Sequence, residues 1–103
     1  MFKKEFTIEE LVTEVKRIVY DNDCFLIDRI FEEPDLYWIL WGDGTWKTLD
    51  KEDPQIWVIE EIAEVYLAEQ YDKYDYTDEE WDSRTVKVDE EVKHVVITVG
   101  EDE

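Results

Sequence analysis

Carboxylates are the residues in this sequence best suited to do chemistry, and they crowd the stretch YDKYDYTDEEWD, residues 71–82. Six acids stand there against one lysine, Lys73, with four aromatic rings among them. A fixed group of carboxylates attracts cations before contact, and aromatic rings add contact area and pair with the faces of arginine and lysine. The stretch therefore predicts a surface that recognises basic side chains. The alternative is an ordinary solvated acidic face whose rings pin the segment to the core.

Catalytic and metal chemistry have weaker support in the sequence. His94 is the only histidine and falls within an expected strand, and the single cysteine, Cys24, suits a small buried hydrophobe. No nucleophile stands beside a histidine, and carboxylates are too abundant for one pair to stand out as acid and base. The calcium-loop pattern is missing, so Asp21, Asp23 and the acids of 78–82 would hold Ca²⁺ or Mg²⁺ only loosely. We expect no catalytic residues, no metal and no cofactor.

The net charge restricts the partners. The chain has 30 acidic and 11 basic residues, a formal net charge of −19, of which residues 35–103 carry −15. A small domain needs only about 2–8 net charges for solubility, and a larger excess opposes compactness. A nucleic-acid duplex or an anionic membrane would repel the protein, since both are bound through Lys and Arg. A basic protein is the natural complement. With neither an apolar leader segment nor an apolar run of ~20 residues, we expect a cytoplasmic protein.

The elements that must position these groups follow from hydrophobic periodicity and turn residues. A chain of 103 residues with 44% hydrophobic content is one domain's worth of folded protein. We expect helices over 7–20 and 55–71, the second opened by Asp53 and Pro54, and strands over 24–31, 36–41, 45–49, 84–88 and 92–99. The strand over 36–41 looks buried on both faces, and Gly42–Gly44 forms a tight hairpin turn. The order α-β-β-β-α-β-β predicts a single α+β domain over 1–103: one antiparallel sheet of about five strands with two helices packed on it, and a flexible tip at 100–103.

The second helix organises the acids into a ridge. Its polar residues recur every three or four positions and so share one face. The row would reach Asp82 if the helix continued, whereas Thr77 with Glu80 forms a capping box that would end the long helix near Tyr76. A helix from Pro54 to Tyr76 would span on the order of 30 Å. The predicted partner-binding residues are Glu60, Glu61, Glu64, Asp72, Tyr74, Asp75, Tyr76, Asp78, Glu79, Glu80, Trp81 and Asp82, with Trp81 as the apolar anchor.

In size, acidity and aromatic content the whole chain resembles the phage-encoded DNA-mimic inhibitors, which include anti-restriction proteins, some anti-CRISPR proteins and inhibitors of uracil-DNA glycosylase or of HU-type nucleoid proteins. The group shares no fold or motif, so no residue role carries over. The resemblance implies a protein that blocks the DNA-binding surface of a basic host protein in a bacterial cytoplasm, such as a nucleoid protein, a nuclease, or a transcription or defence protein. The runner-up is an immunity protein that neutralises one basic nuclease toxin. An enzyme or metal-binding module ranks third, and a homodimer is left open.

Overall fold

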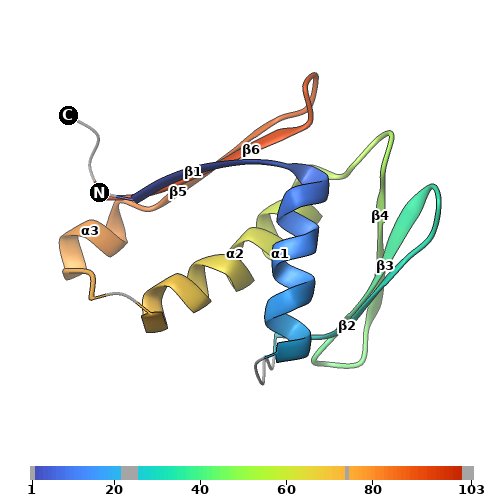
Figure 1. Ribbon diagram of the computed structural model, residues 1–103, viewed down its shortest axis with the longest axis horizontal. Coiled ribbons are helices and arrows are strands. Elements are labelled where there is room, and N and C mark those ends of the chain that lie inside the picture. Colours follow the sequence, from blue (N-terminus) through green and yellow to red (C-terminus); the bar gives the residue numbers. More distant parts are fainter. Residues whose placement is uncertain (1, 22–25, 74, 101–103) are drawn as a thin grey trace.

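The computed structural model is a small α+β domain built on two antiparallel sheets of three strands each (Figure 1). The structure describes residues 2–21, 26–73 and 75–100. Its elements are β1 (Phe2–Thr7), α1 (Ile8–Asp21), β2 (Ile27–Glu32), β3 (Leu36–Trp41), β4 (Trp46–Asp50), α2 (Ile56–Lys73), α3 (Asp78–Asp82), β5 (Thr85–Asp89) and β6 (His94–Val99). The α+β class is as predicted, but the single sheet of about five strands is wrong.

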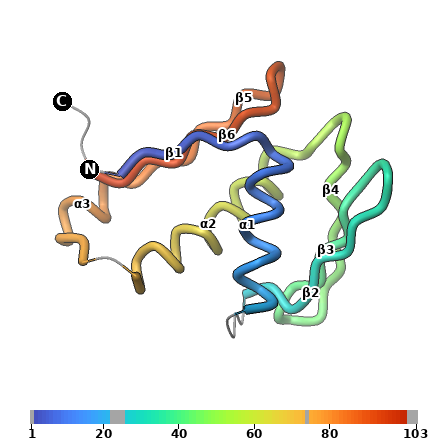
Figure 2. The backbone as a smooth tube through the Cα atoms, viewed as in Figure 1, coloured from blue at the N-terminus to red at the C-terminus, as the bar shows by residue number. Residues whose placement is uncertain are grey.

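The two sheets divide the strands by position in the chain. One has the order β1-β6-β5 and the other the order β2-β3-β4. In Figure 2 the first sheet lies along the top of the view, α2 runs below it, and α1 stands between α2 and the second sheet. The molecule measures 39 × 33 × 19 Å, with α3 and the β2–β3–β4 sheet at opposite ends of its long axis (Figure 1). The acidic stretch 71–82 therefore lies far from the second sheet.

The first strand explains why the one-sheet prediction fails. The sequence predicts no strand in the segment FKKEFT and places its first element, a helix, from Thr7 onward. The segment pairs with β6 in a continuous antiparallel register, from Phe2 opposite Val99 to Thr7 opposite His94. This pairing gives the β5–β6 hairpin a third strand of its own. No local pattern reveals a partnership between the two ends of the chain.

One hydrophobic core serves both sheets. The first contributes Phe6, Val95 and Ile97, while the second contributes residues such as Ile30 and Ile39, all at most 3% exposed. Aliphatic side chains of α1 and α2 fill the space between the sheets. Burying a side chain of this size is worth about 1.5–3 kcal/mol, so this shared core is what holds the two sheets in place.

Strand β3 is buried on one face only, not on both as expected. Tyr37 and Ile39 point into the core, whereas Trp38 between them points outward and is exposed. The indole N–H of Trp38 donates a 3.0 Å hydrogen bond to Oε1 of Glu33, and the ring meets Trp46 edge-on. Apolar composition alone could not separate a strand buried on both faces from one whose outer face is aromatic.

The sequence predicted where helices α1 and α2 begin from short motifs at their starts. Thr7 and Glu10 form the predicted capping box at the start of α1: the Glu10 N–H donates to the Thr7 hydroxyl at 3.0 Å, and the Thr7 N–H donates to the Glu10 carboxylate at 2.8 Å. Helix α2 begins at Ile56, slightly later than Asp53 and Pro54 suggested. In the turn that precedes the helix, the carboxylate of Asp50 accepts the N–H groups of Glu52 and Asp53.

Candidate functional site: an acidic ridge and an aromatic pocket

The predicted ridge is divided between two helices. Helix α2 ends at Lys73, and α3 starts after Thr77, which forms the capping box with Glu80. The break left open by the sequence is therefore the arrangement found. On α2 lie Glu60, Glu61, Glu64 and Asp72; in the connecting segment lie Asp75 and Tyr76; on α3 lie Asp78, Glu79, Glu80, Trp81 and Asp82. Tyr74 and Cys24 lie outside the described residues.

On α2 the acids follow one solvent-facing strip. Glu60, Glu64 and Asp72 are exposed, while Ile59, Ile62 and their apolar neighbours are buried. Trp57 and Tyr71 stand near the two ends of the strip, at 51% and 52% exposure. The strip therefore combines charge with apolar contact area, which is the combination expected of a surface that binds basic side chains.

The fold brings part of the divided ridge back together. A pocket of about 300 Å³ between α2 and β5 is lined by Glu60, Glu64, Asp82 and Arg84, among others. Asp82 approaches the α2 acids here although it sits on a different helix. A continuous helix is thus not needed for these three carboxylates to share one surface. Asp75, Asp78 and Glu79 are exposed in the connecting segment and the first turn of α3.

Most ridge carboxylates form no ion pair with a basic side chain among the described residues, although Arg84 lines the same pocket as Glu60, Glu64 and Asp82. Arg17 pairs with Glu14, Asp21 and Glu69, Lys73 with Glu69, and Lys51 with Glu32. Of the ridge residues, only Glu61 forms an ion pair within the described part of the chain, with Lys47 at 3.4 Å. The carboxylates of Glu60, Glu64, Asp72, Asp75, Asp78, Glu79 and Asp82 make no ion pair there. Ion pairs among the described residues therefore leave this part of the charge unneutralised.

Three predicted site residues, Tyr76, Glu80 and Trp81, are instead engaged in packing or capping. Glu80 accepts the Thr77 N–H at 3.0 Å, a bond that lowers the pKa of its carboxyl. The Trp81 ring is half-buried against the core between Tyr71 and Tyr76, with ring centroids 4.7 and 6.0 Å away. The guanidinium of Arg84 lies 4.8 Å from the centroid of the Trp81 ring. These contacts give Trp81 an anchoring role within the protein itself.

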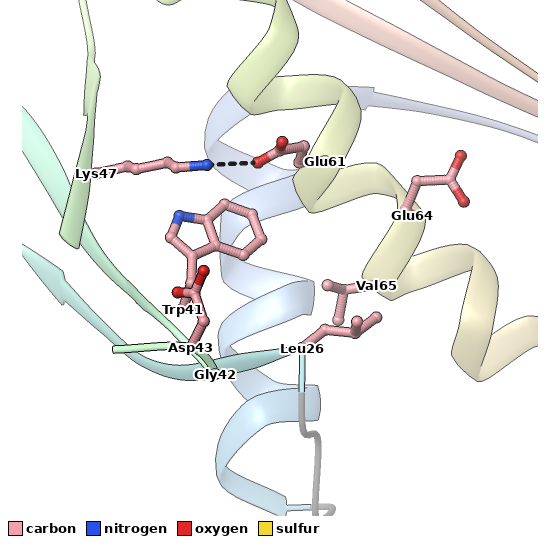
Figure 3. Close-up of a pocket in the computed structure, with 8 residues that line it drawn as sticks. All are labelled: Leu26, Trp41, Gly42, Asp43, Lys47, Glu61, Glu64 and Val65. Carbon is pink, nitrogen blue, oxygen red and sulfur yellow. Dashed lines mark hydrogen bonds and ion pairs between the residues drawn. The ribbon is translucent and has the colours of Figure 1, made fainter. Parts of the chain in front are cut away.

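A second pocket, which sequence reasoning did not predict, lies between α2 and the β3–β4 turn (Figure 3). Its volume is about 420 Å³. It is lined by Leu26, Trp41, Gly42, Asp43, Lys47, Glu61, Glu64 and Val65. The Lys47 ammonium lies 5.0 Å from the centroid of the Trp41 ring and 4.9 Å from that of Trp57. The indole nitrogen of Trp41 is buried without a hydrogen-bond partner among the described residues.

An exposed aromatic group covers the outer face of the β2–β3–β4 sheet. Phe31 and Trp46 stack at 5.9 Å, and Trp38 meets Trp46 edge-on at 6.3 Å. All three rings are exposed. In the sequence these three rings lie in three separate strands. Only the pairing of those strands shows that the rings share one face.

The remaining chemical candidates have structural roles. Nδ1 of His94 lies 2.7 Å from Oε1 of Glu5 across the β1–β6 pair, a contact between neighbouring strands on the outer face of the sheet. Gly100 is buried and its N–H donates to the carbonyl of Glu80, while residues 101–103 of the expected flexible tip lie outside the described residues. In the described ranges, no group of three or more His, Cys, Asp or Glu side chains is placed to share a metal ion.

No protein-family model, curated protein or solved structure matches the chain. None of the described helices is both long and apolar enough to cross a membrane. Helix α2 contributes residues to both candidate surfaces, the acidic ridge and the aromatic pocket.

Proposed function

We propose that the protein is a DNA-mimic inhibitor, which binds a basic DNA-binding protein through its acidic ridge and blocks the site for nucleic acid. The observation that supports this most is the state of the ridge carboxylates. Seven of the predicted positions are exposed or line an open pocket, and none of their carboxylates forms an ion pair with a basic side chain in the described part of the chain, although Arg84 lines the same pocket as three of them. Folding gains nothing from this arrangement, because like charges at helical spacing destabilise a helix by about 0.2–0.5 kcal/mol per pair.

A binding role accounts for that cost. Helix α2 has 18 residues, a length of roughly 27 Å at ~1.5 Å per residue. A fixed line of negative charge on that scale accelerates the approach of a basic surface and competes with phosphates for the same Lys and Arg. Carboxylates also stand in other turns, such as those at 52–53 and 89–91. Binding through the ridge should therefore depend on where the carboxylates lie and not only on the net charge.

The test compares two variants with the same change in net charge. The ridge variant replaces Asp72, Asp75, Glu79 and Asp82 with Lys. The control replaces Glu52, Asp53, Glu90 and Glu91 with Lys, four exposed residues away from the ridge. Each protein, immobilised, is used to capture proteins from a bacterial lysate, and bound proteins are eluted with rising salt.

We expect the natural sequence and the control variant to retain a DNA-binding protein that added duplex displaces, and the ridge variant to lose it. Circular dichroism checks that both variants are folded. Retention by the folded ridge variant would refute the ridge, and equal loss in both variants would show that net charge alone is responsible.

The immunity-protein alternative is favoured by one observation, the exposed rings of Phe31, Trp38 and Trp46. Apolar contacts resist salt, so an interface centred on them would hold one nuclease tightly at high ionic strength. Binding through the ridge should instead weaken steeply with salt and extend to several DNA-binding proteins. The salt at which the captured protein elutes therefore separates the two functions.

A further inference from the structure

We propose that the pocket between Trp41 and α2 binds an arginine side chain, with the Trp41 indole as its wall and the carboxylates of Glu61 and Glu64 as its counter-charges (Figure 3). The inference rests on the proposed function, in that the arginine would belong to the basic partner. It adds a specific contact to a surface otherwise defined by charge. Glu64 connects the two, because it lines both this pocket and the one between α2 and β5.

The pocket is large enough and suitably lined for such a side chain. Its volume of about 420 Å³ lies within the range of small-ligand sites, roughly 300–1,000 Å³. Leu26 and Val65 supply apolar contact for the methylene stem of an arginine. In Figure 3 the Glu61 carboxylate lies above the Trp41 ring and points toward Lys47, whereas Glu64 lies farther along α2 with its carboxylate turned away from that ring. An apolar pocket bordered by carboxylates favours a long side chain that ends in a cation.

A cation already uses part of this chemistry. The Lys47 ammonium lies between the rings of Trp41 and Trp57 and pairs with Glu61 at 3.4 Å. The protein's own lysine thus shows that these groups accept a positive charge by cation–π and ionic contact. Three carboxylates line the pocket, those of Asp43, Glu61 and Glu64, against this one ammonium. The remaining negative charge favours the binding of a second cation.

Guanidinium fits the remaining groups better than ammonium does. Its plane stacks on an indole face, and its fork of N–H donors reaches two carboxylate oxygens at once. An ammonium is more strongly hydrated and loses more on entering an apolar pocket. Lysine side chains of the partner are therefore expected to bind more weakly here than arginine.

The direct test uses a capped Gly-Arg-Gly peptide and the isosteric Gly-citrulline-Gly peptide, which lacks the charge. Each is titrated into the ¹⁵N-labelled protein while the indole N–H signals are followed by NMR. We expect the arginine peptide to shift the Trp41 signal and leave those of Trp38 and Trp46, on the outer face of the second sheet, in place. An equal response to citrulline, or no response at Trp41, would overturn the proposal.

Two substitutions change the pocket charge in opposite directions. Glu64→Gln should weaken binding of the arginine peptide about two- to fivefold, the effect of losing one exposed ion pair. Lys47→Met should strengthen it by a similar factor, because it removes the competing ammonium and keeps the stem. The matched controls are Glu90→Gln and Lys87→Met, which alter net charge equally at exposed positions away from the pocket. Controls that shift affinity as much as the pocket variants would contradict a local site.

Failure of this inference is distinguishable from failure of the proposed function. A pocket that binds the arginine peptide in a protein that captures no DNA-binding protein would refute only the proposed function. Ridge-dependent capture by a protein whose Trp41 signal ignores the peptide would refute only the pocket. A lysine peptide that binds as tightly as the arginine peptide would contradict the preference for guanidinium.

Discussion

The two sheets share a core, but their outer faces carry different kinds of side chain. On the β1-β6-β5 sheet, Lys87 and Glu5 flank Val96 across three strands, so charges of both signs cover the outside. On the β2-β3-β4 sheet the equivalent face carries Phe31 opposite Trp38, with Trp46 stacked beside them. Alternation along the strands produced both faces. Only the residues chosen for the outward positions differ.

The difference shows that acidity is one of two features available for recognition. A sheet face of mixed charges is typical of a face that contacts water. Exposed aromatic rings in a contiguous group are less usual and mark surfaces that contact other molecules. The second sheet therefore carries an exposed aromatic face at the opposite end of the molecule from α3 (Figure 1).

Truncating one core residue of each sheet gives the largest expected effect and tests whether the sheets fold as one unit. Ile39→Ala on β3 and Ile97→Ala on β6 each remove a side chain that is 0% exposed. Each should lower the free energy of unfolding by about 2–5 kcal/mol, with a single transition in urea because the core is continuous. Two separate transitions, monitored by circular dichroism and by tryptophan fluorescence, would show that the sheets are independent units.

The hairpin turns of the two sheets should respond differently to a change at their left-handed residues. Gly44, in the β3–β4 turn, has φ +89°, so Gly44→Ala should destabilise the protein by about 1–2 kcal/mol. Lys93, before β6, has φ +55° despite its side chain. Its ammonium donates a 3.1 Å hydrogen bond to the carbonyl of Lys51, after β4, and so connects the two sheets.

Lys93→Gly should therefore change stability by less than about 0.5 kcal/mol, because relief of backbone strain and loss of that hydrogen bond nearly cancel. Urea denaturation measures both variants. A Lys93→Gly protein stabilised by as much as Gly44→Ala is destabilised would mean that the contact between the sheets contributes nothing.

The sequence predicted the features that depend on near neighbours. Both capping boxes, Thr7 with Glu10 and Thr77 with Glu80, and the turn at Gly42–Gly44 are present, because each depends on residues at most three positions apart. The acidic strip of α2 follows from helical periodicity in the same way. The helix break at Thr77 was foreseen as one of two alternatives. The capping box favoured a break, whereas the helical spacing of the acids up to Asp82 favoured a continuous helix, and local pattern alone did not rank the two.

The features that the sequence did not predict depend on distant contacts. The pairing of β1 with β6 joins the two ends of the chain. The pocket gathers Trp41, Lys47 and Glu61 from three different elements, and their separations in sequence match no helical or strand period. The half-buried position of Trp81 depends on its packing against the ring of Tyr71, which lies on a different helix.

Removing an outer-face aromatic residue should have a moderate effect on folding. Trp46→Thr deletes the stack with Phe31 and the edge contact with Trp38, so a loss of about 0.5–1.5 kcal/mol is expected. On the first sheet Thr98→Ala, also outward-facing, should stay within about 0.5 kcal/mol. Thermal melts compare the two. A Trp46→Thr protein as stable as the natural sequence would mean that the rings contribute nothing to folding, which would strengthen their assignment to a binding surface.

The smallest expected effects are those of acid titration. Beside each sheet, one carboxylate accepts a backbone N–H group, and protonation would break that hydrogen bond. Beside the first sheet, hydrogen bonds from Thr77 lower the pKa of Glu80; in the second, hydrogen bonds from Thr45 lower the pKa of Asp43. A lowered pKa in the folded state stabilises the protein at pH values above the unfolded pKa, roughly 3.9–4.3. That contribution disappears as the pH falls through the lowered values.

The amide protons that these carboxylates accept report the titration directly. The Thr77 N–H lies 3.0 Å from Oε1 of Glu80, and the Thr45 N–H lies 2.9 Å from Oδ1 of Asp43. Their NMR shifts should each change with a midpoint below the ordinary carboxyl value, because protonation breaks the bond that lowers the pKa. Glu80→Gln should abolish the transition at Thr77 and leave that at Thr45 intact. A midpoint at or above the ordinary value would mean that repulsion among nearby carboxylates outweighs the local hydrogen bond. The Thr77 and Thr45 signals report this separately for Glu80 and Asp43.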